Sequence, residues 1–302
     1  MKPPEGVQAN YPLARLTTIR TGGPAEWFST AGSSERLAEL LAWADNEKLP
    51  VGVVGSGSNL LVADEGVRGL VLKLDGDLAS MEPEGHRILC GGGARLPQAA
   101  ALAARAGLTG LEFGVSIPGT VGGAVKMNAN AYGGDLARVL EWVEIVRAGE
   151  AERRTPDSLG FRYRRSNLQP GEVVAQASFA LDPADPADVK RALADLRAQR
   201  REAQPSGIKT FGSTFKNPDD PRTNGKTAGQ LLEAAGCRRL QVGGARLSEK
   251  HANFVENTGE ATTADVIALM AEGRRRVREH SGVELEPEVQ FLGDVNAEAL
   301  YS

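Results

Sequence analysis

A serine in the stretch "FGSTFKNP" (Phe211–Pro218) is the first candidate for chemistry in this 302-residue chain. Ser213 lies between small residues and the pair Lys216–Asn217, which suits a nucleophile, a proton donor, a phosphate ligand or a turn residue. A serine nucleophile needs a base and an orienting acid, and the G-x-S-x-G context of many hydrolases is absent. The local residues therefore argue against a nucleophile and leave the other three roles open.

Two glycine-rich runs could offer main-chain N–H groups to an anion. The run "GSGSN" (Gly55–Asn59) presents consecutive N–H groups beside small side chains, as anion-binding nests do. The run "PGTVGGAV" (Pro118–Val125) could do the same near a predicted helix start. Each run alone is equally consistent with tight turns. Together they favour a large ligand with a pyrophosphate at its centre.

The common nucleotide-binding motifs are incomplete. In "GSGSNL", Leu60 stands where the dinucleotide-binding fingerprint needs its third glycine. In "DPRTNGKT", Asp220 stands where the Walker A motif needs its first glycine, and no apolar strand precedes it. The sequence therefore argues against a Rossmann site and against a P-loop.

Composition argues against several other classes of protein. The net charge of -4 is unfavourable for binding nucleic acid. Cys90 and Cys237 lie far apart, and the three histidines lack metal-ligand spacing, so we expect no disulfide framework and no metal site. No apolar run approaches the roughly 18 residues of a spanning helix, and the first residues lack a signal-peptide core. We expect a soluble cytoplasmic protein with no membrane insertion.

Hydrophobic periodicity predicts a mixed α+β chain. The expected helices cover residues 33–50, 96–108, 186–203, 227–237 and 262–282, and the expected strands cover 51–55, 70–74, 87–96, 142–148, 173–181, 251–257 and 283–293. Thr227 with Gln230 and Thr262 with Asp265 have the spacing of helix-capping pairs. Residues 55–69 are expected to form a loop.

Eight stretches together resemble the UDP-N-acetylenolpyruvoylglucosamine reductase family. They are "TTIRTGGPAEWF", "GSGSNLLVADEGVRGLVL", "GLEFGVSIPGTVGGAVKMNANAYGG", "FRYRRSN", "GSTFKNP", "AGQLLEAAG", "HANFVEN" and "LEPEVQFLG". They follow the family's order between Thr17 and Gly293, and they are specific only in combination. The long tyrosine-bearing insertion of one subclass is missing, so the chain resembles the shorter, type II form.

The resemblance implies an α+β fold and a flavoenzyme reaction. It implies a vanillyl-alcohol-oxidase-like FAD-binding region in two subdomains, residues 1–77 and 78–197, and a substrate-binding domain, residues 198–302. The implied reaction is the NADPH-dependent reduction of UDP-N-acetylglucosamine enolpyruvate to UDP-N-acetylmuramate in peptidoglycan precursor synthesis. NADPH delivers a hydride to FAD, FAD N5 delivers it to C3 of the enolpyruvyl group, and C2 receives a proton.

The resemblance assigns three catalytic residues. Ser213 matches the proton donor to C2, and Arg164, within the Tyr–Arg–x–Ser spacing of "YRRS", matches the arginine that stabilises the carboxylate and enolate. Glu288 matches the catalytic glutamate, with Glu286 as its rival two residues away. Burial beside apolar Val289 would raise the pKa of Glu288 and let it donate a hydrogen bond.

The resemblance also points to binding residues. For a non-covalent FAD they are Arg20, Thr21, Gly22, Gly55, Ser56, Gly57, Ser58, Asn59, Leu60, Ile117, Pro118, Gly119, Thr120, Gly122, Gly123 and Ala124. For the UDP-sugar they are Tyr163, Lys216, Asn217, Arg201 and Gln204. No obligate protein partner is implied.

Two residues depart from the family pattern, and two other functions stay open. Asn130 stands where a glycine is more usual, which asparagine's tolerance of left-handed backbone would absorb. Glu256 replaces a small or apolar residue, and the sequence offers no account of it. The alternatives are another FAD-dependent oxidoreductase of the same fold and a non-catalytic UDP-sugar-binding protein.

Overall fold

The chain divides into two compact units in the computed structural model, which describes residues 2–301. The first unit comprises the residues up to Asn10, Glu26–Ser56 and Arg68–Arg200. The second comprises Tyr11–Ala25, Gly57–Val67 and the residues from Arg201 onward. Residues 1–77, which we predicted to form one subdomain, are thus shared between the units, and the predicted domain limits remain a prediction.

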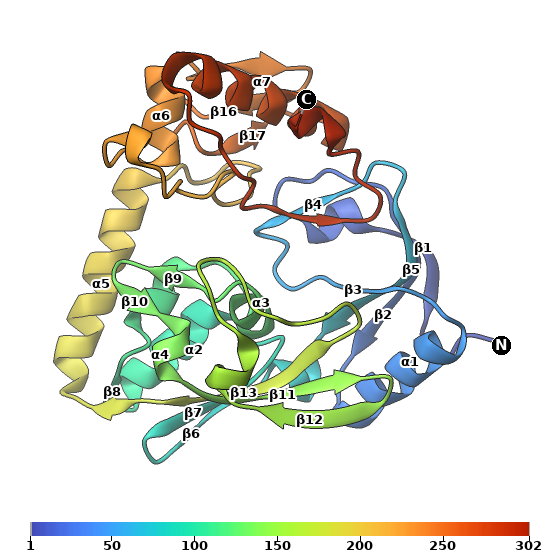
Figure 1. Cartoon of the computed structure of the whole chain (residues 1–302). Helices are drawn as coiled ribbons and strands as arrows, with labels where there is room; N and C mark the ends of the chain where they lie inside the picture. The colour runs from blue at the N-terminus through green and yellow to red at the C-terminus, as the bar shows by residue number, and fades with distance from the viewer. Residues whose placement is uncertain (1, 302) are drawn as a thin grey trace. The chain divides into compact units, whose positions relative to one another are not determined.

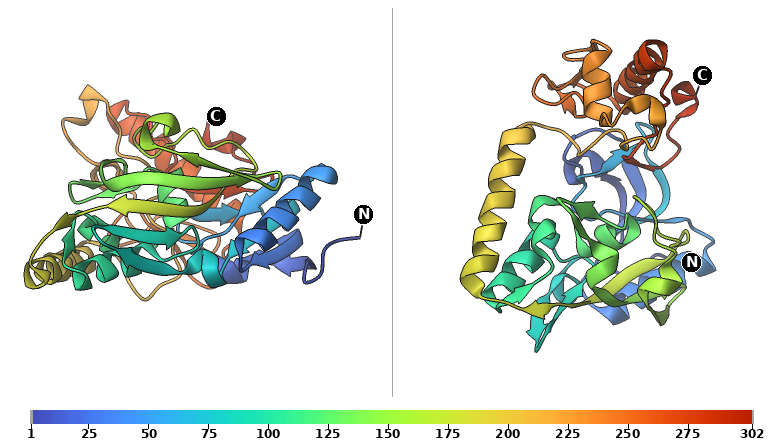
Figure 2. Two further views of the ribbon diagram at one scale, coloured as in Figure 1. Left: turned by 90° about the horizontal axis from the view of Figure 1, so that it is seen from below. Right: turned by 60° about the vertical axis from the view of Figure 1, so that its left-hand side comes forward.

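A five-stranded antiparallel sheet forms the larger part of the first unit (Figure 1). Its order is β12 (Glu150–Arg154), β11 (Leu140–Arg147), β13 (Val173–Ala180), β7 (Arg87–Gly91) and β6 (Met81–Glu84), and Figure 2 (left) shows these strands side by side. Its buried side chains share one core with helix α2 (Leu96–Arg105), α3 (Val121–Lys126) and the first half of α5 (Pro186–Ala203). Strand β13 is buried along most of its length, because Val174, Ala177 and Phe179 belong to this core while Val173 and Ala175 belong to the core that contains α1.

A second, four-stranded sheet in the first unit has the order β1 (Gln8–Pro12), β2 (Pro24–Ala31), β5 (Val67–Leu74), β3 (Val51–Val53). Helix α1 (Ser34–Asn46) packs its leucines into the core beside this sheet, and Ser33 caps the helix by accepting a hydrogen bond from the Arg36 N–H. Strands β3 and β5 are parallel. The chain leaves β3 just before the glycine loop that begins at Gly55, and it returns to this sheet as β5.

Short elements complete the first unit. They are the pair β8 (Leu108–Thr109) with β14 (Asp182–Pro183), the pair β9 (Asn130–Ala131) with β10 (Gly134–Asp135), α4 (Leu136–Val139), and the 3-10 turns η2 (Gly76–Ala79), η3 (Glu112–Ser116) and η4 (Pro156–Leu159).

The second unit is built around helix α7 (Thr263–Ser281) and helix α6 (Ala228–Ala234), which pack together. A three-stranded sheet has the order β15 (Gln241–Val242), β16 (Ala245–Leu247), β17 (Val255–Asn257), and β4 (Leu60–Val62) pairs in parallel with β18 (Gln290–Leu292). The 3-10 turns are η1 (Leu13–Leu16), η5 (Pro221–Thr223) and η6 (Glu298–Leu300). Ile19 and Leu61 are fully buried in this unit's core, so early segments of the chain help to build it.

The predicted α+β class and the long helices are confirmed, while several strands are shorter than predicted. Both capping boxes are present, at α6 and α7, and Gly282 ends α7 in the left-handed region. Residues 251–257 and 283–293 contain strand only at Val255–Asn257 and Gln290–Leu292. Our expectation of a loop throughout 55–69 was wrong, because Leu60–Val62 form β4. Within residues 2–301, no helix is long and apolar enough to cross a membrane.

Asp64 ties the loop after β4 to the start of α7. One carboxylate oxygen accepts from the Thr263 N–H at 2.8 Å, and the other accepts from the Ala264 N–H at 2.9 Å. The Thr263 hydroxyl donates to the Val62 carbonyl at 2.6 Å. A carboxylate at this place satisfies N–H groups that the helix leaves without partners and lies at the positive end of its dipole.

We expect Asp64→Ala to lower the free energy of unfolding by about 1–2 kcal/mol, the usual cost of losing a helix cap. Urea unfolding followed by circular dichroism would measure the change. The control is Glu65→Ala, which removes a neighbouring exposed carboxylate. Equal effects of the two substitutions would show that the hydrogen bonds of Asp64 do not stabilise the unit.

Candidate active site

Ser213 lies in an irregular segment that is hydrogen-bonded on both sides. The Gly212 N–H donates to the Ser58 carbonyl at 2.9 Å, and the Thr214 N–H donates to the Asn253 carbonyl at 2.8 Å. Thr214 and Phe215 are buried, whereas Ser213 is half-buried. Among the described residues, none forms a hydrogen bond with the Ser213 hydroxyl. The segment therefore fixes the main chain of Ser213 and leaves its hydroxyl available.

Glu288 is held against the same segment. Its N–H donates to the Thr214 carbonyl at 2.8 Å, and its carbonyl accepts from Asn59 Nδ2 at 3.3 Å. The Gln290 N–H donates to the Asn59 carbonyl at 3.1 Å. The second unit thus brings together three stretches that are distant in sequence: the end of the first glycine loop, the Ser213 segment and the Glu288 segment.

The rival carboxylate has a different environment. The Glu286 side chain is 73% exposed and forms an ion pair with Lys216, with 3.2 Å between Nζ and Oε2. Glu288 is half-buried, and its neighbour Val289 is buried. Glu286 is therefore already engaged by Lys216 at the surface.

Asn253 supports the serine segment and was missed by the sequence analysis. Its Oδ1 accepts from the Phe215 N–H at 2.9 Å, and its Nδ2 donates to the Phe215 carbonyl at 2.8 Å. Asn253 is buried, and this pairing gives both ends of its amide a hydrogen-bond partner. The signal was an amide between apolar Ala252 and Phe254, where a buried polar side chain needs a specific partner.

Arg164 belongs to the first unit, at the tip of a tight turn. The turn is closed by Arg162 and Arg165, whose N–H and carbonyl groups bond reciprocally at 3.0 and 3.1 Å. Arg164 itself has φ of +55°, a conformation that non-glycine residues rarely adopt. Its Nη1 donates to Asn130 Oδ1 at 2.8 Å and to the Asn130 carbonyl at 3.2 Å. The guanidinium is therefore oriented by Asn130.

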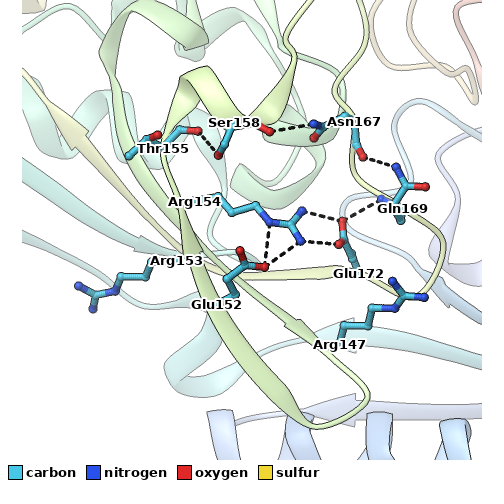
Figure 3. A pocket seen from close by; sticks show the side chains of 9 residues that line it. All are labelled: Arg147, Glu152, Arg153, Arg154, Thr155, Ser158, Asn167, Gln169 and Glu172. Carbon is cyan, nitrogen blue, oxygen red and sulfur yellow. Dashed lines mark hydrogen bonds and ion pairs between the residues drawn. The ribbon is translucent and has the colours of Figure 1, made fainter.

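An ion pair closes the base of the connection that carries Arg164 (Figure 3). Arg154 ends β12 and Glu172 precedes β13, and their side chains form a two-pronged ion pair at 2.7 and 3.1 Å. Burial by itself would raise the pKa of Glu172, but the hydrogen bonds from Arg154 and from the Gln169 N–H hold that pKa below its usual value. The Glu172 side chain is 3% exposed. This ion pair therefore holds together the two ends of the connection between β12 and β13.

A solvent-open pocket of about 610 Å³ surrounds this ion pair. It is lined by Arg147, Glu152, Arg153, Arg154, Thr155, Ser158, Asn167, Gln169 and Glu172. The lining includes none of the residues predicted for the site. Figure 3 shows the hydrogen bonds running from Thr155 through Ser158 and Asn167 to Gln169, along the two sides of the connection.

The first glycine loop packs closely against the protein and still leaves its N–H groups without acceptors. A Cβ on Gly55 would lie 2.4 Å from Thr120 Oγ1, and one on Gly57 would lie 2.0 Å from the Leu16 carbonyl oxygen. Lys73 Nζ donates to the Gly55 carbonyl at 3.1 Å. Among residues 2–301, none accepts from the main-chain N–H groups of residues 55–59. Lys73, a lysine within the apolar strand "LVLKL", is a second supporting residue that the sequence analysis missed.

The second glycine run behaves differently, and one expectation about it was wrong. The N–H groups of Val121 and Gly122 donate to the carbonyls of Ala94 and Gly92, both at 2.8 Å, and the Gly123 N–H donates to Thr120 Oγ1 at 3.4 Å. The first turn of α3 therefore has no N–H group left for an anion. At Gly119, however, a Cβ would meet only Ile117 Cγ2, at 3.8 Å, so the space beside this run is open.

A turn formed by Arg20, Thr21 and Gly22 follows Thr18, which is hydrogen-bonded to the first glycine loop. The Thr18 N–H and hydroxyl both donate to the Gly57 carbonyl, at 3.0 and 3.1 Å. Arg20 and Gly22 have φ of +65° and +108°, and a Cβ on Gly22 would lie 2.5 Å from Val62 Cβ. Arg20 is exposed and Thr21 is buried.

The residues predicted to bind the UDP-sugar are spread over both units. In the second unit, Lys216 is paired with Glu286, and Asn217 Oδ1 accepts from the Ala228 N–H at the start of α6, at 3.1 Å. Arg201 is exposed, and Gln204 is half-buried. In the first unit, Tyr163 is 45% exposed and its ring centroid lies 5.0 Å from Arg164 Cζ.

The glycine loop is suited to a phosphate-bearing cofactor. Besides the N–H groups without acceptors, Ser56 Oγ and Asn59 Oδ1 are buried polar atoms with no hydrogen-bond partner among the described residues. Leaving such groups unsatisfied is costly, so each is suited to a ligand. The N–H groups and the Ser56 hydroxyl fit FAD, whose pyrophosphate accepts hydrogen bonds, and Asn59 Oδ1 would accept from a hydroxyl or N–H group of the cofactor.

We expect Gly55→Ala to destabilise the protein by about 1–3 kcal/mol, because its new Cβ overlaps Thr120 Oγ1. Thermal unfolding of the variant would measure this. Gly119→Ala is the matched control, since its Cβ meets an ordinary contact distance. Adding Thr120→Ala to Gly55→Ala should restore part of the loss, and the absence of any restoration would contradict the packing argument.

The ion pair of Glu172 predicts a pH dependence of stability. Because the folded pKa is below the unfolded pKa of about 4.3, its stabilisation is present above that pH and is lost as pH falls through the folded pKa. We expect Glu172→Gln to cost about 2 kcal/mol at pH 7, with the difference from wild type shrinking below about pH 4. Urea unfolding at several pH values would measure it.

Glu152→Gln is the control for this ion pair. Glu152 binds the same guanidinium but is 64% exposed, so its loss should cost less than about 1 kcal/mol. A difference between wild type and Glu172→Gln that stays constant from pH 7 to pH 3 would refute a charged, paired Glu172.

Comparisons with known proteins place this site in a family. The model of the UDP-N-acetylenolpyruvoylglucosamine reductase C-terminal domain matches residues 204–292, and the FAD binding domain matches residues 25–155. UDP-N-acetylenolpyruvoylglucosamine reductase 2 of Symbiobacterium thermophilum is 44% identical over 97% of this chain and 94% of its own length. The reductase of Rubrobacter xylanophilus is 43% identical over 94% of each chain.

A solved structure agrees with these sequence relatives. The crystal structure of UDP-N-acetylenolpyruvylglucosamine reductase from Thermus caldophilus matches with a TM-score of 0.81 and 38% identity, covering 95% of this chain and 98% of that one. The resemblance that the sequence motifs indicated is confirmed. The chain belongs to the UDP-N-acetylenolpyruvoylglucosamine reductase family and is an FAD-dependent oxidoreductase.

Proposed function

We propose that the chain reduces UDP-N-acetylglucosamine enolpyruvate to UDP-N-acetylmuramate with NADPH, as a step in peptidoglycan precursor synthesis. Family membership over nearly the whole chain supports the reaction. One structural observation carries the mechanistic part: hydrogen bonds hold the Ser213 and Glu288 segments together beside Ser58 and Asn59. These hydrogen bonds would fix the proposed proton donor Ser213, the Glu288 carboxyl group and the end of the proposed cofactor loop relative to one another.

The FAD site that we propose centres on the loop Gly55–Asn59 with Leu60. Its N–H groups, Ser56 Oγ and Asn59 Oδ1 would receive the cofactor's polar groups. The open space at Gly119 supports a contribution from the run Ile117–Ala124 through van der Waals contact rather than through helix N–H groups. Arg20, Thr21 and Gly22 would contribute by shaping the loop at Gly57.

Ser213 is the proposed proton donor to C2. The chemistry that bound FAD supplies is hydride transfer from NADPH to C3 of the enolpyruvyl group. Addition at C3 leaves negative charge shared between C2 and the carboxylate. The Ser213 hydroxyl donates its proton to C2 and is reprotonated from solvent afterwards. Its position in a fixed segment, with a hydroxyl that no described residue engages, supports this role.

Arg164 and Glu288 are the proposed stabilisers of that charge. A guanidinium is planar, always charged and suited to binding a carboxylate through two N–H groups. Glu288 would donate a hydrogen bond as a protonated acid, and its half-buried position supports it over exposed Glu286. Fixed donors directed at developing charge are usually the largest contribution to such catalysis.

The residues that would contact the UDP-sugar are Lys216, Asn217, Arg201, Gln204 and Tyr163. Lys216 reaches a phosphate only by leaving its surface ion pair with Glu286, which costs little because such pairs contribute at most about 1 kcal/mol. Asn217 keeps Nδ2 for the substrate while Oδ1 holds the start of α6.

We expect Ser213→Ala to separate the two half-reactions. Anaerobic stopped-flow absorbance of the bound flavin would show reduction by NADPH within about twofold of wild type, because the serine takes no part in that step. Reoxidation by the enolpyruvyl substrate should slow by roughly 10²–10⁴-fold, the usual contribution of a positioned proton donor. Ser206→Ala, at an exposed serine of the same connection, is the control.

Three results would contradict the proposal. Equal slowing of both half-reactions would mean that Ser213 shapes the flavin site. Wild-type flavin that is reoxidised by oxygen and not by the enolpyruvyl substrate would indicate an oxidase of the same fold. A purified protein that cannot be loaded with FAD would exclude a flavin reaction altogether.

A further inference from the structure

Asn130 makes a contact that the usual residue at its position cannot make. Its side-chain Oδ1 accepts from Arg164 Nη1 at 2.8 Å, while its carbonyl accepts from the same nitrogen at 3.2 Å. A guanidinium only donates hydrogen bonds, so the amide must present its oxygen to Arg164. Glycine, the more usual residue here, would supply the carbonyl alone. The departure that the sequence analysis noted therefore adds a second acceptor to Arg164.

Asn130 is itself well placed to act as a fixed point. It begins β9, which pairs with β10 in register Asn130↔Asp135. The hairpin turns through Tyr132 and Gly133, both with positive φ, as tight two-residue hairpins require. A Cβ on Gly134 would lie 2.4 Å from Phe113, so the hairpin is closely packed against its own unit. The main chain of Asn130 cannot easily move to follow Arg164.

Neighbouring residues hold the main chain of the arginine turn, and the Tyr163 ring centroid lies 5.0 Å from Arg164 Cζ. Asn128 Nδ2 donates to the Arg162 carbonyl at 3.3 Å, and the Ser166 hydroxyl donates to the Lys126 carbonyl at 2.9 Å. These contacts fix the position of the main chain from which the Arg164 side chain extends. An arginine side chain nevertheless has about 2 kcal/mol of rotamer entropy to lose. Acceptors at the far end of the side chain reduce that freedom, and Asn130 supplies two of them.

We propose that Asn130 is a positioning residue that orients the Arg164 guanidinium through Oδ1 for the enolpyruvyl carboxylate. This inference rests on the proposed function, because it assumes that Arg164 acts on that carboxylate. Pre-orientation removes part of the entropy cost at the moment of reaction. The effect should therefore appear in the step that uses the carboxylate and be absent from flavin reduction by NADPH.

A double-mutant cycle of Asn130→Gly and Arg164→Lys tests the inference. Asn130→Gly should slow flavin reoxidation by the enolpyruvyl substrate about tenfold, as expected for one hydrogen bond to a charged group, with NADPH reduction within twofold. In the Arg164→Lys background, Asn130→Gly should change reoxidation by less than twofold, because the fork of N–H donors is already lost.

Asn130→Asp is the conservative variant, since it keeps an acceptor at the same place. It should retain reoxidation within about threefold of wild type, whereas Asn130→Ala should match Asn130→Gly. Agreement of Ala with Gly would exclude a mere effect of glycine flexibility on the hairpin.

The possible outcomes separate this inference from the proposed function. Equal slowing by Asn130→Gly in both backgrounds, or slowing of both half-reactions, would overturn positioning through Arg164. Unchanged reoxidation in Asn130→Gly, beside a strong loss in Arg164→Lys, would overturn the inference and leave the proposed function intact. Unchanged reoxidation in Arg164→Lys would overturn the role of Arg164 and the inference with it.

Discussion

Hydrogen bonds to a single peptide stretch, Ser58–Asn59, organise the part of the site that lies in the second unit. The Ser58 carbonyl accepts a hydrogen bond from the N–H of Gly212, the residue before Ser213. The Asn59 carbonyl accepts one from the N–H of Gln290, two residues after Glu288. The Asn59 side chain adds a bond to the Glu288 carbonyl. One short stretch therefore sets the position of two catalytic candidates from distant parts of the chain. Because the same stretch ends the proposed cofactor loop, an error in its placement would disturb cofactor, donor and carboxyl group together.

The two glycine runs illustrate different uses of the same residue. Gly55 and Gly57 are required by contacts within the protein, since a side chain at either place would overlap Thr120 or the Leu16 carbonyl. Their close packing turns the loop without using its N–H groups, which remain for a ligand. In the second run, the N–H groups of Val121, Gly122 and Gly123 donate hydrogen bonds to other groups of the protein. In the proposed FAD site, the first run would therefore supply hydrogen bonds and the second would supply van der Waals contact.

Much of this arrangement could be predicted from the sequence, and the failures have physical causes. Helix caps are local, so the spacing of Thr227 with Gln230 and of Thr262 with Asp265 marked where α6 and α7 begin. The strand at Leu60–Val62 was missed because it is only three residues long and depends on a partner at Gln290–Leu292. Asn253, Asn130 and Lys73 were missed as site residues for the same reason. Each acts on a residue far along the chain, and no periodicity or motif spacing encodes such a partner.

The placement of Arg164 shows how a strained backbone and a flexible side chain can be controlled separately. The positive φ of Arg164 is a local cost of order 1 kcal/mol, which the reciprocal bonds of Arg162 and Arg165 and the contacts from Asn128 offset. The ion pair of Arg154 and Glu172 closes the connection behind the turn. None of these contacts touches the guanidinium. Asn130 contacts the charged group itself, so under the proposed positioning role a substitution there would change catalysis while the turn itself stays folded.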